Sequence, residues 1–314
     1  MNFAKRLAVR KAALAQIADL VEVDPRVVFV GSDLGAGTLT DLMNRHPQRV
    51  LMEGIAEQHV VGMSAGLALE GFVPFVHTIG TFLTRRAFEQ VAMDVALHKL
   101  PVRLIASGGG MVYAPLGPTH EAIDDLALMR AVPGMSIFCP IDPLEMREVV
   151  AALSDFPGPA YVRVGKGGEP IVTEPGFIPG PPRILRKGSR ILVLSTGAIG
   201  HECLAAADLM EAGAVTVAHI PTVSPFDGEA VIALMDAHEF TLVVEEHLPS
   251  GGLWTAVVEY CARLGVQDFA HQASLPAGFP TAYGSQRQHW EAAGLTGIQI
   301  AAQMRELMEE SAHG

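Results

Sequence analysis

The stretch Leu51–Gly66, LMEGIAEQHVVGMSAG, places a short apolar run directly before a segment rich in small residues. Val50–Met52 predicts a strand and Glu57–Leu69 predicts a helix, so the stretch indicates one strand–helix unit. Glu57 is the only acidic residue between Ile55 and Leu69. A lone carboxylate in apolar surroundings tends to be neutral, because burial raises its pKa, and it can then donate a hydrogen bond. The alternative is an acid that only complements the helix dipole.

The same alternation of strands and helices continues on both sides of this unit. Strands are predicted at Val27–Val30, Val50–Met52, Val73–His77, Val102–Ala106, Ser136–Cys139 and Ala160–Val164. Helices are predicted at Glu57–Leu69, Phe82–Leu97, Glu121–Ala131 and Pro143–Leu153. Apolar runs without polar alternation are typical of strands covered on both faces. We therefore expect a doubly wound α/β domain built on a parallel sheet.

A change of composition divides the chain. Glycine and proline dominate Gly165–Gly188 and periodicity vanishes, which indicates an interdomain linker. A second doubly wound α/β pattern follows, with strands at Ile191–Leu194, Val215–His219 and Thr241–Val244, and helices near His201–Glu211, Glu229–Asp236, Gly252–Leu264 and Thr296–Met308. We predict domains at residues 1–165 and 189–314, joined by a linker at 166–188.

Bulk properties exclude several classes of protein. A length of 314 residues suggests two domains, and 49% hydrophobic residues are enough for large cores. No apolar stretch approaches the roughly 20 residues of a membrane span. A net charge of −12 without a basic cluster argues against nucleic-acid binding. The three cysteines are scattered without metal or redox spacing, so we expect no metal site in this chain and a cytoplasmic location.

The order of several motifs carries a family resemblance. The first domain resembles the pyrimidine-binding domain of the transketolase family, which includes deoxyxylulose-phosphate synthase and, more distantly, the β subunits of 2-oxo-acid dehydrogenases. The second domain resembles the family's C-terminal domain. The matching motifs are GSDL at Gly31–Leu34, GIAEQH at Gly54–His59, GTFLTRRAFEQ at Gly80–Gln90, GPTHEA at Gly117–Ala122, YVRVGKG at Tyr161–Gly167, STG at Ser195–Gly197 and VVEEHLPSGGL at Val243–Leu253.

The resemblance implies a thiamine diphosphate site. Glu57 matches the family's catalytic glutamate, which hydrogen-bonds the cofactor's aminopyrimidine and so promotes its activation, and Ile55 lies beside it in the same motif. Phe82 and Phe88 match aromatic residues that pack around the pyrimidine, although both also suit an ordinary helix core. Asp33 matches an aspartate near the cofactor, and a turn or N-cap aspartate is its alternative.

The resemblance also implies substrate contacts. His120 matches a histidine of the substrate channel that bonds substrate oxygens, and a solvated loop histidine is the alternative. Arg163 matches an arginine that binds the distal phosphate of sugar substrates, with a surface salt bridge as the alternative. Arg85 or Arg86 is expected to reach the channel, but an extra residue in the motif leaves open which one.

Two departures concern the substrate. Leu116 stands directly before GPTH, where the family usually has an aspartate that bonds a substrate hydroxyl, and leucine cannot make this bond. Gly108–Gly110 occupies a segment where transketolase has a phosphate-contacting histidine. We therefore hypothesise a substrate that is less hydroxylated or not phosphorylated.

The family's diphosphate-binding signature, Gly-Asp-Gly followed by an asparagine, is missing. Phe226-Asp227-Gly228 is the nearest string and lies in the second domain. The resemblance therefore implies the C-terminal subunit of a split transketolase. A separate N-terminal subunit would hold the diphosphate and Mg²⁺ in an α2β2 heterotetramer that includes β-subunit self-association. The isolated chain would be inactive.

Three functions remain open at this point. The leading hypothesis is transfer of a two-carbon ketol unit from a ketose to an aldehyde. The second is acyl transfer from pyruvate, as in deoxyxylulose-phosphate synthase or the 2-oxo-acid dehydrogenases, because AEQH resembles the synthase motif. The third is a non-catalytic scaffold, against which the joint presence of Glu57, Phe82 and His120 argues.

Overall fold

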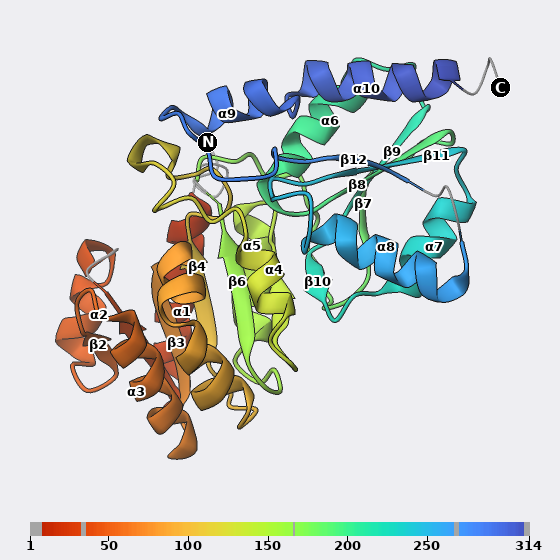
Figure 1. Cartoon of the computed structure of the whole chain (residues 1–314). Coiled ribbons are helices and arrows are strands. Elements are labelled where there is room, and N and C mark those ends of the chain that lie inside the picture. The colour runs from red at the N-terminus through yellow and green to blue at the C-terminus, as the bar shows by residue number, and fades with distance from the viewer. Residues whose placement is uncertain (1–7, 33–35, 166, 267–269, 311–314) are drawn as a thin grey trace, which may run out of the picture.

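Two parallel-dominated sheets organise the chain in the computed structural model, which describes residues 8–32, 36–165, 167–266 and 270–310 (Figure 1). The seven-stranded sheet has the order β10-β5-β6-β4-β3-β1-β2. Its strands are β1 (Val27–Gly31), β2 (Val50–Met52), β3 (Val73–Ile79), β4 (Arg103–Ser107), β5 (Ser136–Phe138), β6 (Ala160–Val164) and β10 (Thr222–Ser224). All neighbouring pairs except β10–β5 are parallel.

Helices cover both faces of this sheet, so its central strands are buried throughout. They are α1 (Val9–Val23), α2 (Thr40–Arg45), α3 (Glu57–Leu69), α4 (Asp125–Arg130) and α5 (Pro143–Ala152), with π-helical segments η3 (Phe82–Arg86) and η4 (Gln90–Ala96) and 3₁₀ turns η2 (Ala36–Thr38) and η5 (Ala114–Leu116). On one face α3 packs against η4, and on the other α1 packs against α5. Asp142 caps α5 by accepting from the backbone N–H groups of Leu144 and Glu145, before Pro143 at the first helical position.

The second sheet has the order β12-β11-β8-β9-β7, and only the β7–β9 pair is antiparallel. Its strands are β7 (Arg183–Arg186), β8 (Ile191–Ser195), β9 (Val215–His219), β11 (Phe240–Val244) and β12 (His271–Ala273). Its helices are α6 (Gly200–Asp208), α7 (Gly228–Asp236), α8 (Leu253–Leu264), α9 (Gln286–Ala293) and α10 (Gly297–Glu310), with the 3₁₀ turn η6 (Gly197–Ile199). Figure 1 shows α6, α9 and α10 on one side of this sheet, opposite α7 and α8.

The predicted α/β fold class with two sheets is confirmed, and several elements differ in detail. The helix predicted at Phe82–Leu97 is divided into η3 and η4, with backbone bonds of the π type from the Ala87 N–H to the Phe82 carbonyl and from the Leu97 N–H to the Ala92 carbonyl. Such π-helical turns are rare and frequently lie at functional sites. The helix predicted from Glu121 begins only at Asp125, because Gly117–Asp124 forms a loop.

Several further elements were not predicted, among them α2 and β12. β7 lies inside the stretch predicted as linker, where surrounding glycine and proline residues conceal a short, partly exposed edge strand. β10 follows the second sheet's β9 but pairs with β5 of the first sheet. α9 has few apolar residues, and its capping box is formed by Ser285 and Gln288.

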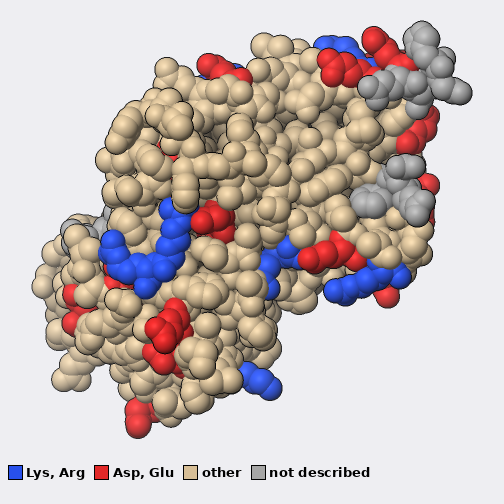
Figure 2. Space-filling view, in the orientation of Figure 1, with Lys and Arg blue, Asp and Glu red and all other residues tan. Residues whose placement is uncertain are grey.

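The surface of the described residues carries no long apolar helix and little charge segregation. Within residues 8–310, excluding the short undescribed gaps, no helix is both long and apolar enough to cross a membrane. Figure 2 shows positive and negative side chains lying next to each other on the visible face. This intermixing agrees with the many surface ion pairs, for example Arg190 with Glu239 and Arg45 with Glu22.

Candidate active site

The segments that follow β2, β3 and β4 bring together the main predicted site residues. Glu57 begins α3 after β2, Phe82 begins η3 after β3, and His120 lies in the loop between β4 and α4. These three strands and β1 are parallel and adjacent, so the segments share one edge of the sheet. In open α/β sheets, ligands bind at this carboxyl edge.

Glu57 is buried, with 1% of its surface exposed, but its surroundings are not purely apolar as expected from the sequence. The hydroxyl of Thr78 donates to Glu57 Oε1 at 3.3 Å, and Arg86 Nη1 donates to Oε2 at 2.6 Å. Ser32 in turn donates to Thr78 at 3.1 Å, which helps to fix the Thr78 hydroxyl. The carboxylate is therefore compensated by a guanidinium in this structure.

Arg86 links Glu57 to the aromatic residues. Its guanidinium lies 4.2 Å from the centroid of the Phe82 ring, within the range of a cation–π interaction. The Phe82 ring also meets His120 edge-on, with ring centroids 5.2 Å apart. Thr119 Oγ1 lies 2.9 Å from His120 Nδ1 and restrains that ring. We call Glu57, Thr78, Phe82, Arg86 and His120 the Glu57 cluster.

Arg85 lies away from Glu57 and holds the loop that carries His120. Its guanidinium pairs with Asp124 at 2.8 Å and donates to the backbone carbonyls of Pro118 and Glu121. It also lies 5.4 Å from the centroid of Phe279, a residue of the second domain. Of the two arginines, Arg86 is the one that faces Glu57.

Arg163, the predicted phosphate ligand, is buried inside the molecule. It donates to Asp125 Oδ2 at 3.0 Å and to the backbone carbonyls of Ala122 and Glu246 at 2.8 and 3.0 Å. Burial acts to lower the pKa of Arg163, but the charge of Asp125, together with those of Cys139, Glu246 and Tyr161, outweighs it, and the pKa is raised. Arg163 is therefore neither an open phosphate site nor part of a surface salt bridge, because its guanidinium forms hydrogen bonds to buried groups of the chain itself.

The glycines at 108–110 make this arrangement possible. A Cβ on Gly109 would lie 2.4 Å from Arg163 Cγ, and one on Gly110 would lie 2.3 Å from Glu246 Cδ. A Cβ on Gly108 would lie 2.2 Å from the Tyr113 ring. Gly110 therefore permits close packing against Glu246 of the second domain, and Gly108 and Gly109 permit it within the first.

The remaining predicted residues are dispersed. Phe88 is half-buried and packs against the apolar core of the first domain, as the alternative interpretation expected. Ile55 and Leu116 are exposed by 68% and 53%. Asp33 lies outside the described residues.

Sequence reasoning missed Thr78, the pairing of Arg86 and the loop contacts of Arg85. Arg86 stood in a quoted motif, but only the π-helical geometry of η3 decides the direction of its side chain. Thr78 gave no signal, because a threonine in a buried strand is common. Phe279 could not be found, since its contact with Arg85 joins positions almost 200 residues apart.

Glu121 is a second buried carboxylate beside the cluster. It is 0% exposed, and within the described part of the chain neither of its carboxylate oxygens has a hydrogen-bond partner. Burial raises the pKa of Glu121, and the charge of Arg85 partly opposes this. A buried carboxylate without hydrogen bonds favours its neutral form.

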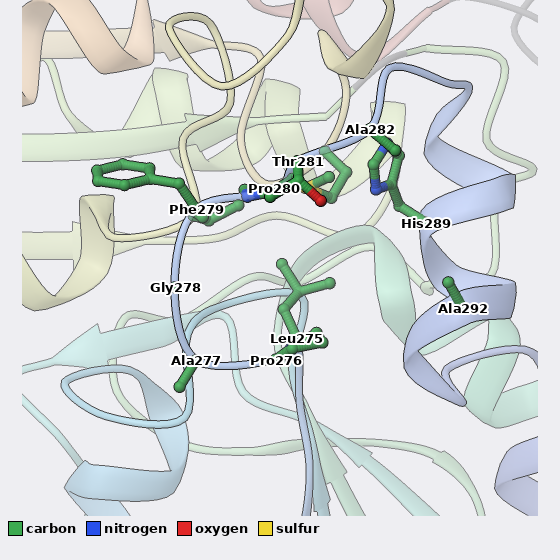
Figure 3. A pocket seen from close by; sticks show the side chains of 12 residues that line it. Leu275, Pro276, Ala277, Gly278, Phe279, Pro280, Thr281, Ala282, His289 and Ala292 are labelled. Carbon is green, nitrogen blue, oxygen red and sulfur yellow. The ribbon is translucent and has the colours of Figure 1, made fainter.

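A cavity of about 270 Å³ lies where the second domain meets Met111 and Ile123 of the first. Its walls include the loop from Leu275 to Ala282 and the α9 side chains of His289 and Ala292, and in Figure 3 Phe279 points away from His289. None of its described lining residues belongs to the Glu57 cluster. The Glu57 cluster, where titratable groups converge, is therefore a better candidate for the active site than this largely apolar cavity.

No metal centre accompanies these groups in the described residues. Across 8–32, 36–165, 167–266 and 270–310, no group of three or more histidine, cysteine, aspartate or glutamate side chains is placed to hold a metal ion. Cys139, Cys203 and Cys261 are all free and buried. Burial raises the pKa of Cys139 and of Cys203 to about 12, so these thiols are poor nucleophiles.

Comparison with known proteins matches both domains to one family. Residues 5–168 match the family described as transketolase, pyrimidine binding domain, and residues 180–300 match the transketolase C-terminal domain. The chain is 34% identical over 303 residues to the 1-deoxy-D-xylulose-5-phosphate synthase of Oleidesulfovibrio alaskensis, covering 93% of this chain but 47% of the synthase. The chain thus spans about half the length of such synthases.

Two relatives of similar size complete the comparison. One subunit of the apulose-4-phosphate transketolase of Actinobacillus succinogenes is 35% identical over 243 residues, which are 76% of this chain and 78% of that subunit. A solved structure described as a split gene transketolase, inactive beta4 tetramer, superimposes with a TM-score of 0.84 at 29% identity, covering 96% of this chain and 98% of that one. With both of its domains matched in order, the chain belongs to the transketolase family.

Proposed function

We propose that this chain is the β subunit of a two-component, thiamine diphosphate-dependent enzyme that transfers a two-carbon ketol unit from a ketose to an aldehyde. The observation that carries the proposal is the buried Glu57 carboxylate at the carboxyl edge of the sheet, which Arg86 links to the Phe82 ring, with His120 against the same ring. A buried acid beside an aromatic face suits the recognition of a flat, nitrogen-bearing ring.

The contacts of Arg86 support the Glu57 cluster as a binding site for the cofactor's aminopyrimidine. The flat guanidinium of Arg86 already stacks on Phe82 at 4.2 Å and donates to Glu57 at 2.6 Å. A planar ring can take the same place against Phe82, and its ring nitrogen can accept a hydrogen bond from the Glu57 carboxyl when that group carries a proton. Glu57 and Phe82 would hold the pyrimidine, and Asp33 and Ile55 stay further candidates from the motif resemblance.

Each residue has a distinct task in the proposed reaction. When bound, thiamine diphosphate supplies a nucleophilic carbon and an electron sink. Glu57 would hold a hydrogen bond to the pyrimidine nitrogen, which is the contact that activates the cofactor. His120 would bind substrate oxygens and exchange a proton with a hydroxyl. Phe82 would exclude water from the ring face.

The diphosphate and Mg²⁺ would be bound by a separate N-terminal subunit in an α2β2 assembly. Two observations support this. A relative of similar size is named as one subunit of a transketolase, which favours a partner chain. The split-gene structure is described as inactive as a beta4 tetramer, which also supports self-association of the β subunit.

The substrate would be less polar at one end than an ordinary sugar phosphate. Leu116 exposes an apolar side chain beside the GPTH loop, and Tyr283 packs against Gly117 in that loop with 72% of its own surface exposed. Arg163 is committed to internal hydrogen bonds. A hydroxyl left without a partner in such a site would cost about 1–3 kcal/mol of binding.

Acyl transfer from pyruvate is the alternative, and one observation favours it: the 34% identity to a deoxyxylulose-phosphate synthase extends over 93% of this chain. The test is to purify the chain with a co-produced diphosphate-domain subunit and to supply pyruvate or a ketose, each with an aldehyde acceptor. Product formation from the ketose without CO₂ release is expected. CO₂ from pyruvate would favour the alternative, and no turnover of either donor would favour the scaffold.

A further inference from the structure

Arg86 engages the two side chains that the proposed function assigns to the cofactor's pyrimidine, Glu57 and Phe82. It donates a hydrogen bond to Glu57 and stacks on Phe82. We propose that Arg86 is a place-holder: its guanidinium occupies the pyrimidine position in the cofactor-free subunit and must leave both partners before the ring can bind. This inference rests on the proposed function and adds a specific competitor to it.

The first argument is that both oxygens of Glu57 are already engaged. Oε1 accepts from Thr78 at 3.3 Å, and Oε2 accepts the short, charge-assisted bond from Arg86 at 2.6 Å. A ring nitrogen that approaches Oε2 therefore competes with the guanidinium. The same guanidinium lies over the Phe82 ring, 4.2 Å from its centroid. Arg86 therefore blocks both the hydrogen bond and the stacking contact of an incoming pyrimidine.

The second argument is that Arg86 is placed to move and Arg85 is not. The Arg86 side chain is 43% exposed, and the described residues engage it through Glu57 and Phe82. Arg85 is 27% exposed and makes hydrogen bonds to Asp124 and to two backbone carbonyls of the His120 loop. Releasing Arg85 would disrupt the loop, whereas Arg86 can turn into solvent.

The third argument is the state of the buried carboxylate without cofactor. Glu57 is 1% exposed, and a buried charge without a partner is strongly destabilising. Arg86 provides that partner until a ring replaces it, and in that exchange Glu57 takes up a proton from solvent and donates it to the ring nitrogen. The ion pair prevents a buried, unpaired charge in the free subunit. Because it must be broken before the cofactor binds, it also lowers the affinity for the cofactor.

The test measures thiamine diphosphate binding to the complex of the full chain with the diphosphate-domain subunit, by titration calorimetry in the presence of Mg²⁺. Arg86→Met removes the guanidinium and keeps an unbranched side chain. We expect the Kd to fall about three- to tenfold, as for the loss of a competing ion pair of moderate strength. Loss of a positive charge alone would weaken binding of an anionic cofactor, so tighter binding cannot result from net charge.

Three further variants test whether the effect is specific to the guanidinium of Arg86 and to Glu57. Arg45→Met removes an arginine whose ion pair with Glu22 has the same 2.6 Å distance but lies on α2, and it should leave the Kd unchanged. Arg86→Met in a Glu57→Gln background should give a smaller gain than in the wild type, because the competed charge is gone. Arg86→Lys keeps the charge without the flat fork and should give a smaller gain than Arg86→Met.

The outcomes separate the two proposals. The melting temperature of the free Arg86→Met chain should be lower than that of the wild type, and thiamine diphosphate should raise the melting temperature of its complex more. An equal or weaker affinity in both Arg86→Met and Arg86→Lys, with native circular dichroism, would overturn the place-holder role alone. Absence of thiamine diphosphate binding to the wild-type complex would overturn the proposed function and this inference with it.

Discussion

Arg163 of β6 donates a hydrogen bond of 3.0 Å to the backbone carbonyl of Glu246, which follows β11 in the second domain. The same guanidinium pairs with Asp125 of the first domain, and the hydroxyl of Tyr161 also donates to Asp125, at 2.7 Å. Two motifs that carry the family resemblance, around Tyr161 and around Glu246, therefore meet at the contact between the domains.

Arg163→Met should destabilise the chain by about 3–5 kcal/mol, because it leaves the buried carboxylate of Asp125 without its cation. The free energy of unfolding in urea measures this. Arg190→Met, which breaks an exposed pair with Glu239, should cost less than about 1 kcal/mol. Adding Asp125→Asn to Arg163→Met should recover part of the loss, and no recovery would contradict the ion-pair explanation.

Gly110→Ala should be more destabilising than Gly134→Ala. Both glycines have a positive φ, +66° and +77°, so alanine is strained at either position by about 1–2 kcal/mol. Only at Gly110 would the new Cβ meet the Glu246 carboxylate, which adds about 1–3 kcal/mol of overpacking. Equal losses in urea unfolding would show that the Glu246 contact can relax without cost.

Glu121→Gln should stabilise the chain at neutral pH by about 1–3 kcal/mol, because it removes a buried charge without hydrogen bonds. The pKa of Glu121 in the folded chain is raised above its ordinary value of 4.5. The stability that Glu121 contributes to the wild-type chain is therefore fully present below about pH 4.5 and is lost as pH rises through the folded pKa. The stability difference between variant and wild type should therefore grow from pH 4.5 upward.

Melting temperatures between pH 4 and 8 measure this dependence. Glu211→Gln, at an exposed position, serves as the control and should change stability by less than about 0.5 kcal/mol at every pH. A pH-independent effect of Glu121→Gln would show that Glu121 is compensated in solution.

Glu57→Gln should lower turnover of the reconstituted complex by about 10²–10⁴-fold while thiamine diphosphate still binds, since the amide keeps the shape but not the acid–base chemistry. Steady-state kinetics and cofactor titration measure the two effects separately. Glu53→Gln removes an exposed carboxylate in the same segment and should not produce a comparable loss. Unchanged turnover in Glu57→Gln would remove Glu57 from the mechanism.

The fold was predictable from the sequence where local pattern and burial agree. β2, β6, α3 and β9 match the predicted ranges, because their apolar runs are bounded by clear turn or helix-start residues. The convergence of Glu57, Phe82 and His120 was predictable only through the motif resemblance. The partners of Glu57 were not predictable. The π-helical turn η3 sets the direction of Arg86, and Thr78 is an ordinary residue of a buried strand, so neither has a distinctive sequence signal.

The strand β10 couples the two halves of the sequence. Thr222–Ser224 comes after the Gly- and Pro-rich stretch, yet it pairs with β5, while the N–H of Cys139 donates to the Pro221 carbonyl at 2.8 Å. A fragment ending at residue 188 would lack β10, so β5 would become an exposed edge strand with unpaired backbone groups on that side. Exposed edge strands pair with strands of other chains. Such a fragment should aggregate even though it contains the whole Glu57 cluster, so the second half of the sequence is needed to protect the sheet that carries the candidate site.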